Sequence, residues 1–188
     1  MKDEELHCCD ESKIPLSKYL QVGSGIGRRL LVVGESPDFN GWMKSGRAFY
    51  TLDGKIVPTG KNFLINLKQI DLNLDLGNIS FTEISKCYIG SNRNKLMKCA
   101  SKTWPHFIEQ INYINPKLII LLGKRTTEIF NKIAKTSLTV GDIQEINTLN
   151  VSLDILPIYH PSPLNPKRKQ NAEFFEVNKS KIIKLLTK

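Results

Sequence analysis

The run KLIILL at residues 117–122 is the clearest buried strand in the chain. A continuous apolar run of this length, closed by Gly123, is typical of a parallel strand that is covered on both faces. RLLVVG at residues 29–34 is a second run of this kind. ISFTEISKC at residues 79–87 alternates and is rich in β-forming residues, and VSLDILPIY at residues 151–159 predicts a further strand. We therefore expect four strands.

Helical patterns separate these strands. In residues 60–70 (GKNFLINLKQI) the apolar side chains share one helical face. Further helices are expected at 94–114, about 123–134 and about 171–186, and a hairpin arm is considered at 142–147. Strands that alternate with helices predict an α/β domain with a central, mostly parallel four-stranded sheet. No repeat or linker divides the chain, so we expect one domain over residues 1–188, with residues 1–28 as an N-terminal arm.

Composition narrows the class of partner. The chain has 188 residues, a net charge of +9 and a pI near 9.4. Such a charge favours a polyanion, most plausibly nucleic acid, although a lysine-rich soluble surface is the alternative. No apolar run approaches the roughly 20 residues that span a bilayer. The acidic N-terminus lacks the apolar core of a secretory signal, so we expect a cytoplasmic protein. We also expect it to be a monomer.

Three segments follow predicted strands directly. They are GESPD at residues 34–38, TEISKC at the end of the second strand (residues 82–87) and HPSPLNP at residues 160–166. In open α/β sheets, ligands bind beyond the carboxyl ends of the strands. Because parallel strands present these ends at one edge of the sheet, we expect the three segments to line one pocket.

His160 is the first candidate within this pocket. It follows an apolar strand and precedes a loop stiffened by Pro161, Pro163 and Pro166. A histidine held in such a place is suited to donate a hydrogen bond to an anion that develops on a ligand. A structural histidine that caps the loop is the alternative.

Leu164 lies in the same loop among polar neighbours, which is an unusual place for a core leucine. On a stiff, basic loop an apolar side chain can wedge between stacked bases. Lys167, Arg168 and Lys169 follow at once and are candidates for contacts with phosphates. A solvated charged face is the alternative for these three.

The motifs together carry a family resemblance. GESP and HPSPLNP, in this order, resemble motifs 1 and 2 of the uracil-DNA glycosylase superfamily. SGRAFY, FTEISKC, SNRN and INPKLIILLG resemble segments of its iron–sulfur (family 4) enzymes. The resemblance covers roughly residues 29–168. It implies a three-layer α/β/α fold and a DNA repair enzyme that flips a damaged base into a pocket, cleaves its N-glycosidic bond and leaves an abasic site.

The resemblance also implies roles for residues at the pocket. His160 would stabilise the charge that develops on O2 of the departing base. Phe49 would stack on that base, with an ordinary core aromatic as the alternative. Gly34, Glu35 and Ser36 would hold the base through backbone groups and position the attacking water.

For the DNA itself, the resemblance implies that the HPSPLNP loop makes the contacts. Pro161, Ser162 and Pro163 would press on the phosphates beside the lesion, and Leu164 would fill the vacated stack. The full expected DNA-binding set is Pro161, Ser162, Pro163, Leu164, Asn165, Lys167 and Arg168.

Four cysteines complete the candidate residues. By their spacing alone, Cys8, Cys9, Cys87 and Cys99 could be unrelated buried thiols or a metal site assembled in space. The resemblance implies four thiolate ligands of a structural [4Fe–4S] cluster and no organic cofactor. The family spaces its N-terminal pair as CxxC, whereas Cys8 and Cys9 are adjacent, which leaves the ligands on that side open.

Two positions depart from the family pattern. Ser36 stands where some members carry an Asp that activates water, so Glu35 and Asp38 become the alternative acids and catalysis would rest on stabilising the leaving base. Glu83 stands where the family has an Asn that pairs with the base. An amide offers a donor and an acceptor, whereas an ionised carboxylate only accepts.

An ionised Glu83 would therefore place its carboxylate, which only accepts hydrogen bonds, against uracil O4, which is also an acceptor. Glu83 must be protonated, bridge through water, point away, or face a base that carries a donor at this edge. We hypothesise a shift of preference towards another deaminated or modified base. A degenerate member that binds DNA without turnover, and an RNA- or nucleotide-directed α/β enzyme, remain the competing functions.

Overall fold

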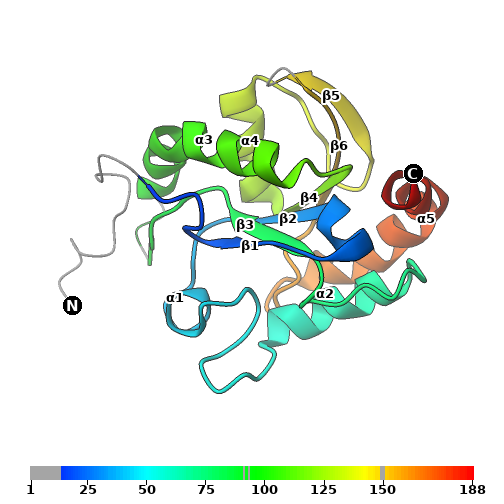
Figure 1. Ribbon diagram of the computed structural model, residues 1–188, viewed down its shortest axis with the longest axis horizontal. Coiled ribbons are helices and arrows are strands. Elements are labelled where there is room, and N and C mark those ends of the chain that lie inside the picture. The colour runs from blue at the N-terminus through cyan, green and yellow to red at the C-terminus, as the bar shows by residue number, and fades with distance from the viewer. Residues whose placement is uncertain (1–13, 91, 93, 149–150) are drawn as a thin grey trace.

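The computed structural model describes residues 14–90, 92, 94–148 and 151–188. Its centre is a six-stranded sheet of order β1-β3-β2-β4-β6-β5 (Figure 1). The strands are β1 (Leu20–Gln21), β2 (Leu30–Gly34), β3 (Ser80–Glu83), β4 (Leu118–Leu122), β5 (Gln144–Thr148) and β6 (Val151–Ile158).

The four inner strands, β3, β2, β4 and β6, are parallel to one another. They are the four strands expected from the sequence patterns, so the predicted mostly parallel α/β sheet is confirmed, but the expected number of four strands is wrong because the sheet has six in the described part of the chain. An antiparallel strand is added at each edge, β1 beside β3 and β5 beside β6. The β5 strand is the hairpin arm considered at residues 142–147. The two-residue β1 is too short to produce a sequence pattern.

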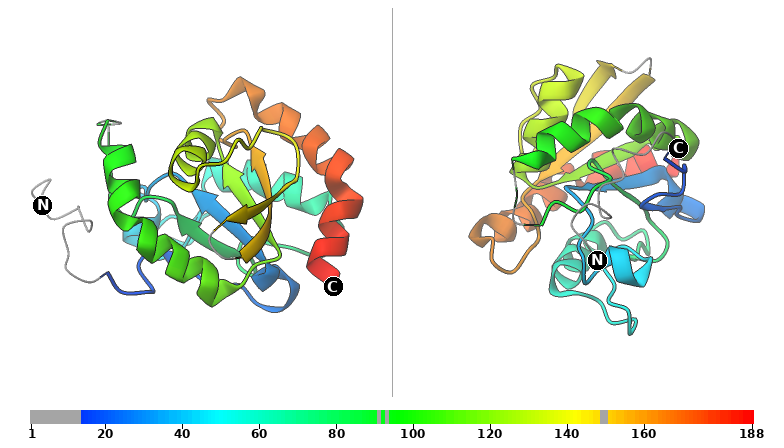
Figure 2. Two further views of the ribbon diagram at one scale, coloured as in Figure 1. Left: turned by 90° about the horizontal axis from the view of Figure 1, so that it is seen from above. Right: turned by 90° about the vertical axis from the view of Figure 1, so that its left-hand side faces the viewer.

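Helices cover both faces of the sheet, as Figure 2 shows. Helices α3 (Lys95–Ile114) and α4 (Lys124–Ala134) pack on one face, against a core that includes Leu31 and Val33. Helices α2 (Pro58–Lys68) and α5 (Asn171–Thr187) pack on the other, against a core that includes Leu30 and Val32. Successive side chains of a strand point to opposite faces, so β2 supplies both cores and forms the middle of three layers.

The helix boundaries follow local signals. Helix α3 ends at Ile114, and the next residue, Asn115, adopts a left-handed conformation (φ 51°) directly before Pro116. Helix α2 begins at Pro58 rather than at Gly60, because proline suits the first helical position. A short helix α1 (Trp42–Ser45) lies between β2 and α2. No helix among the described residues is long and apolar enough to cross a membrane.

The sheet brings the carboxyl ends of β2, β3 and β6 to one edge. Gly34 at the end of β2 pairs in register with Glu83 at the end of β3. Beyond the strands, the Ile84 N–H donates to the Gly34 carbonyl (2.9 Å) and the Ser85 N–H donates to the Glu35 carbonyl (3.2 Å). This continued pairing fixes the two loops against each other.

Candidate functional site

A cavity of about 640 Å³ lies at this edge of the sheet. The three segments predicted to share a pocket all contribute to its wall. The lining residues are Gly34, Glu35, Ser36, Pro37, Asp38, Gly41, Trp42, Phe49, Val57, Thr59, Phe81, Glu83, Tyr88, Gly90, Leu122, His160 and Ser162.

Glu83 forms part of the cavity wall and is only 6% exposed. Its carboxyl lies directly over Gly34, where an added Cβ would be 2.2 Å from Glu83 Oε2. Glu83 thus lies in the cavity wall, with its carboxyl packed against the end of β2.

The surroundings of Glu83 favour its neutral form. The pKa of the carboxyl is raised to about 8, mainly by burial; the charge of Lys86 opposes this rise, and the neighbouring acids Glu35 and Asp38 add to it. Among the described residues, Oε2 has no hydrogen-bond partner. Burial without a partner penalises the charged form most, so Glu83 is predominantly a carboxylic acid at pH 7.

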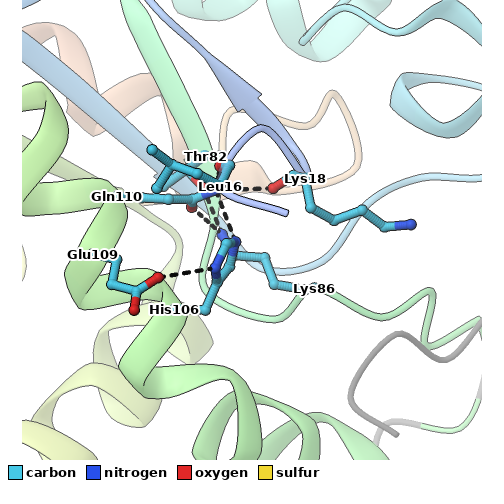
Figure 3. A network of polar contacts seen from close by, with 7 residues as sticks. All are labelled: Leu16, Lys18, Thr82, Lys86, His106, Glu109 and Gln110. Carbon is cyan, nitrogen blue, oxygen red and sulfur yellow. Dashed lines mark hydrogen bonds and ion pairs between the residues drawn. The ribbon is translucent and has the colours of Figure 1, made fainter. Parts of the chain in front are cut away.

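The end of β3, where Glu83 lies, is held in place by Lys86, which is fully buried (Figure 3). The Lys86 ammonium donates to Thr82 Oγ1 (2.6 Å), to Gln110 Oε1 (2.6 Å) and to the Glu83 backbone carbonyl. Three hydrogen bonds satisfy all three donors of a buried ammonium. They tie the end of β3 to helix α3.

The same network anchors the segment that precedes β1. Gln110 Nε2 donates to the carbonyls of Leu16 (2.8 Å) and Lys18 (2.9 Å), and it lies 3.2 Å from His106 Nε2 (Figure 3). Burial and the nearby Lys86 charge lower the pKa of His106, although Glu109 at 3.7 Å opposes them. The part of the N-terminal arm that the structure describes is thus held by polar contacts to α3.

His160 follows β6 and lines the cavity, as predicted. The Ser162 backbone N–H donates to His160 Nδ1 (3.2 Å), so we assign the proton of the neutral ring to Nε2. Asn165 Nδ2 donates to the His160 carbonyl (3.0 Å). Behind the side chain, a Cβ at Gly123 would lie 3.1 Å from His160 Cβ, so the glycine permits this close packing. Nε2 is therefore the ring nitrogen that can donate to a ligand.

The loop after His160 is braced on two sides. Asn62 of α2 donates from Nδ2 to the Pro161 carbonyl (2.8 Å). Asn171, the first residue of α5, accepts from the Tyr159 N–H (3.0 Å) and donates to the Tyr159 carbonyl (2.8 Å). These bonds hold the loop at both ends, which the prolines in the sequence could not do alone.

At the tip of this loop, Leu164 is 93% exposed. Lys167 and Lys169 are also exposed, whereas Arg168 is partly buried. The Arg168 guanidinium donates from Nη1 to the carbonyls of Pro163 (2.9 Å) and Asn165 (3.1 Å). Arg168 therefore stabilises the loop itself, a role that the charge pattern did not reveal.

Phe49 lines the cavity with an unusual backbone conformation, φ +65°. Its ring stacks on Phe63 (centroids 5.7 Å apart) and meets Phe81 edge-on (4.8 Å). A left-handed conformation in a bulky residue is strained, and such strain concentrates at functional sites. The packing holds one face of the site in a fixed position.

Sequence reasoning missed several lining residues. Tyr88 directly follows the predicted strand end, so the rule about carboxyl ends could have included it. Trp42, Val57 and Thr59 come from the α1–α2 region, where no motif or periodicity marks them. Leu122 was predicted only as a strand residue.

The structure describes two of the four candidate cysteine ligands. Cys87 and Cys99 are both buried and are joined in a disulfide, and Ser85 Oγ donates to Cys99 Sγ (2.9 Å). Cys8 and Cys9 lie outside the described residues. Within the described ranges, no group of three or more His, Cys, Asp or Glu side chains could hold a metal ion. A cluster of this type needs four ligands, so these ranges supply a juxtaposed pair that fits half of the site.

The fold and the site define a class of protein. It is a three-layer α/β/α domain with its cavity at the carboxyl ends of the inner strands, beside a braced loop that exposes a leucine and two lysines. A profile of the Uracil DNA glycosylase superfamily matches residues 21–180, and the chain belongs to this superfamily.

Individual relatives agree with this membership. The chain is 25% identical over 170 residues to a Type-4 uracil-DNA glycosylase of Saccharolobus solfataricus, covering 85% of this chain and 73% of the relative. It is 26% identical over 185 residues to the Type-4 uracil-DNA glycosylase of Archaeoglobus fulgidus, covering 96% and 87%. The counterpart in Sulfurisphaera tokodaii is 26% identical over 166 residues, covering 85% and 72%. The resemblance stated from the motifs is confirmed.

Proposed function

We propose that the protein is a monofunctional DNA glycosylase that excises uracil or a related base and leaves an abasic site. The observation that carries this proposal is one cavity lined by His160, Phe49 and Glu83, beside the exposed Leu164. A flipped base needs an aromatic face, polar groups along its edge and a residue that takes its place in the stack. The membership in the superfamily and the names of the relatives support the same activity.

In the proposed reaction, the bond between base and sugar breaks and its electron pair leaves on the base. Water supplies the hydroxyl to the sugar carbon and a proton that finally neutralises the base. His160 Nε2–H donates to O2 of the departing base, where negative charge develops. One well-placed donor of this kind is worth about 10²–10³ in rate.

The attacking water would be positioned by the loop after β2. Ser36 is a weak base, but Glu35 and Asp38 also line the cavity and carry carboxylates. We propose that Glu35 orients the water, with Asp38 as the second acid. Stabilisation of the leaving base then supplies most of the acceleration.

DNA binding would involve the face that carries Leu164. The side chain is exposed and its loop is braced, so it can enter the stack without first losing conformational freedom. Lys167 and Lys169 lie beside it and would neutralise phosphates. Pro161, Ser162, Pro163 and Asn165 would shape the contact with the strand.

We further propose that Cys87 and Cys99, in their reduced form, ligate a [4Fe–4S] cluster together with Cys8 and Cys9. The cluster would act structurally, as a cross-link between the N-terminal arm and the end of β3. Reduced thiols are expected in the cytoplasm, where we place the protein as a monomer. Iron and sulfide analysis of anaerobically purified protein tests this, and a protein that is metal-free, folded and active would contradict it.

The activity is tested with purified protein and duplex DNA that contains a single uracil, followed by alkaline cleavage at abasic sites. We expect strand cleavage that H160A reduces at least 100-fold, while E128Q at an exposed position of α4 leaves it unchanged. Binding to uracil-containing DNA without abasic sites would overturn the proposal and favour the degenerate binding protein. Parallel substrates with hypoxanthine, xanthine and mismatched thymine define which base is preferred.

A further inference from the structure

Glu83 is a buried acid in the cavity wall whose contact with the base the proposed mechanism leaves unspecified. We propose that Glu83 recognises the flipped base as a neutral carboxylic acid, accepting a hydrogen bond from an imide N–H and donating one to the adjacent carbonyl, and that ionisation of Glu83 closes the pocket to this base. This inference rests on the proposed function and names the residue that determines its base specificity.

The geometry supports direct recognition. Glu83 lines the cavity, is 94% buried, and its Oε2 has no hydrogen-bond partner among the described residues. Oε2 is buried against Gly34, and a buried polar atom without a partner costs free energy, which a base recovers once a rotation of the carboxyl turns this oxygen to the cavity. The carboxyl is also pressed against Gly34, so it cannot withdraw in that direction when a base enters.

The hydrogen-bonding pattern decides which base fits. Uracil presents an N–H donor beside a carbonyl acceptor along the edge that faces away from its sugar. A protonated carboxyl offers one acceptor and one donor side by side, as a carboxamide does. An ionised carboxyl offers only acceptors and would repel the carbonyl of the base. The acid form thus resolves the conflict that an ionised Glu83 would create with uracil.

The charges around Glu83 come from several elements. Glu35 and Asp38, in the loop after β2, raise its pKa, and burial raises it most, to about 8. Lys86 opposes them, but its ammonium bonds to Thr82 and Gln110 on the α3 side of the sheet. The Glu83 side chain lies on the opposite face, because side chains of a strand alternate.

Two other titratable groups line the cavity. His160 belongs to the loop after β6, and Tyr88 follows β3. Both residues are present in the wild type and in a variant at position 83. Their own titration therefore contributes to both pH profiles, and the ratio of the two profiles reports on Glu83.

The test compares wild type with E83Q, which is neutral at every pH and retains a donor and an acceptor. We measure kcat/KM on uracil-containing duplex DNA, and the affinity for DNA with a non-cleavable uracil analogue, from pH 6 to 9.5. The ratio of wild type to E83Q should fall about tenfold between pH 7 and pH 9, since the pKa of Glu83 is about 8. E128Q, the same substitution at an exposed site on α4, should follow the wild-type profile.

The outcomes separate the inference from the function on which it rests. Excision of uracil with the same pH profile in wild type and E83Q would reject the inference alone. A protein that forms no abasic sites at any pH, from any lesion, would reject the proposed function and this inference with it.

Infrared spectroscopy provides a second measurement that does not depend on turnover. The wild type should show the carbonyl band of a protonated carboxylic acid at pH 7 that is lost by about pH 9.5. This band should be absent from E83Q. Should E83Q fold poorly, the pH-dependent loss of the band in wild type still tests the neutral acid, and its absence at pH 7 would overturn the proposal.

Discussion

The buried acid at Glu83 predicts that the stability of the protein falls as pH rises. The pKa of Glu83 is raised from its ordinary 4.5 to about 8 in the folded state. Between these values the folded protein binds more protons than the unfolded chain, so the free energy of unfolding decreases with increasing pH. The stabilising effect of protonation is fully present below pH 4.5 and is lost as pH rises to about 8.

The magnitude follows from the same two values. At about 1.36 kcal/mol per pH unit, the gap between 4.5 and about 8 corresponds to about 5 kcal/mol. E83Q removes the ionisation but keeps nearly the same shape. Relative to wild type, the variant should gain roughly 4 kcal/mol in free energy of unfolding between pH 5 and pH 9. This is a large fraction of the 5–15 kcal/mol that typically stabilises a domain.

Urea denaturation of both proteins at pH 5, 7 and 9, followed by circular dichroism, measures this difference. The control is E128Q, because Glu128 is exposed and its removal should shift stability by the same small amount at every pH. A difference between E83Q and wild type that stays constant from pH 5 to pH 9 would refute the assignment of Glu83 as a buried neutral acid.

Three further predictions concern the cavity and its loop. H160A should lower kcat on uracil-containing DNA by at least 100-fold with little change in melting temperature, measured by single-turnover kinetics and thermal denaturation, because the ring stabilises charge rather than the core. L164A should weaken excision from duplex DNA more than from single strands and leave stability within about 0.5 kcal/mol, because the side chain is 93% exposed; equal losses on both substrates would contradict a role in the stack. G34A should destabilise the protein by about 1–3 kcal/mol and abolish base binding, since its Cβ would lie 2.2 Å from Glu83 Oε2; normal affinity for the uracil analogue would contradict the close packing.

The sequence was sufficient for the central architecture because apolar patterns are local. KLIILL at residues 117–122 and RLLVVG at residues 29–34 must be buried on both faces, and this alone predicts inner parallel strands. The rule that ligands bind beyond the carboxyl ends then selected Gly34, Glu83 and His160 as neighbours. All three line one cavity in the structure.

Other features depend on contacts between distant residues and carry no local signal. The buried network around Lys86 joins residues 24 positions apart, from Lys86 to Gln110. Arg168 reads as a free cation in the sequence but bonds to carbonyls of its own loop. The left-handed backbone of Phe49 and the packing of its ring against Phe63 and Phe81 likewise have no signal in the sequence.

Glu83 shows most clearly which properties the sequence determines and which depend on the tertiary structure. The sequence by itself determined that an acid stands at the end of the second inner strand, at the position where the resemblance places the family's base-pairing Asn. Only the tertiary structure decided its protonation state, because desolvation depends on what the fold packs around the carboxyl. The hydrophobic pattern that predicts a strand is local, whereas the pKa of a buried group depends on the environment that the complete fold builds around it.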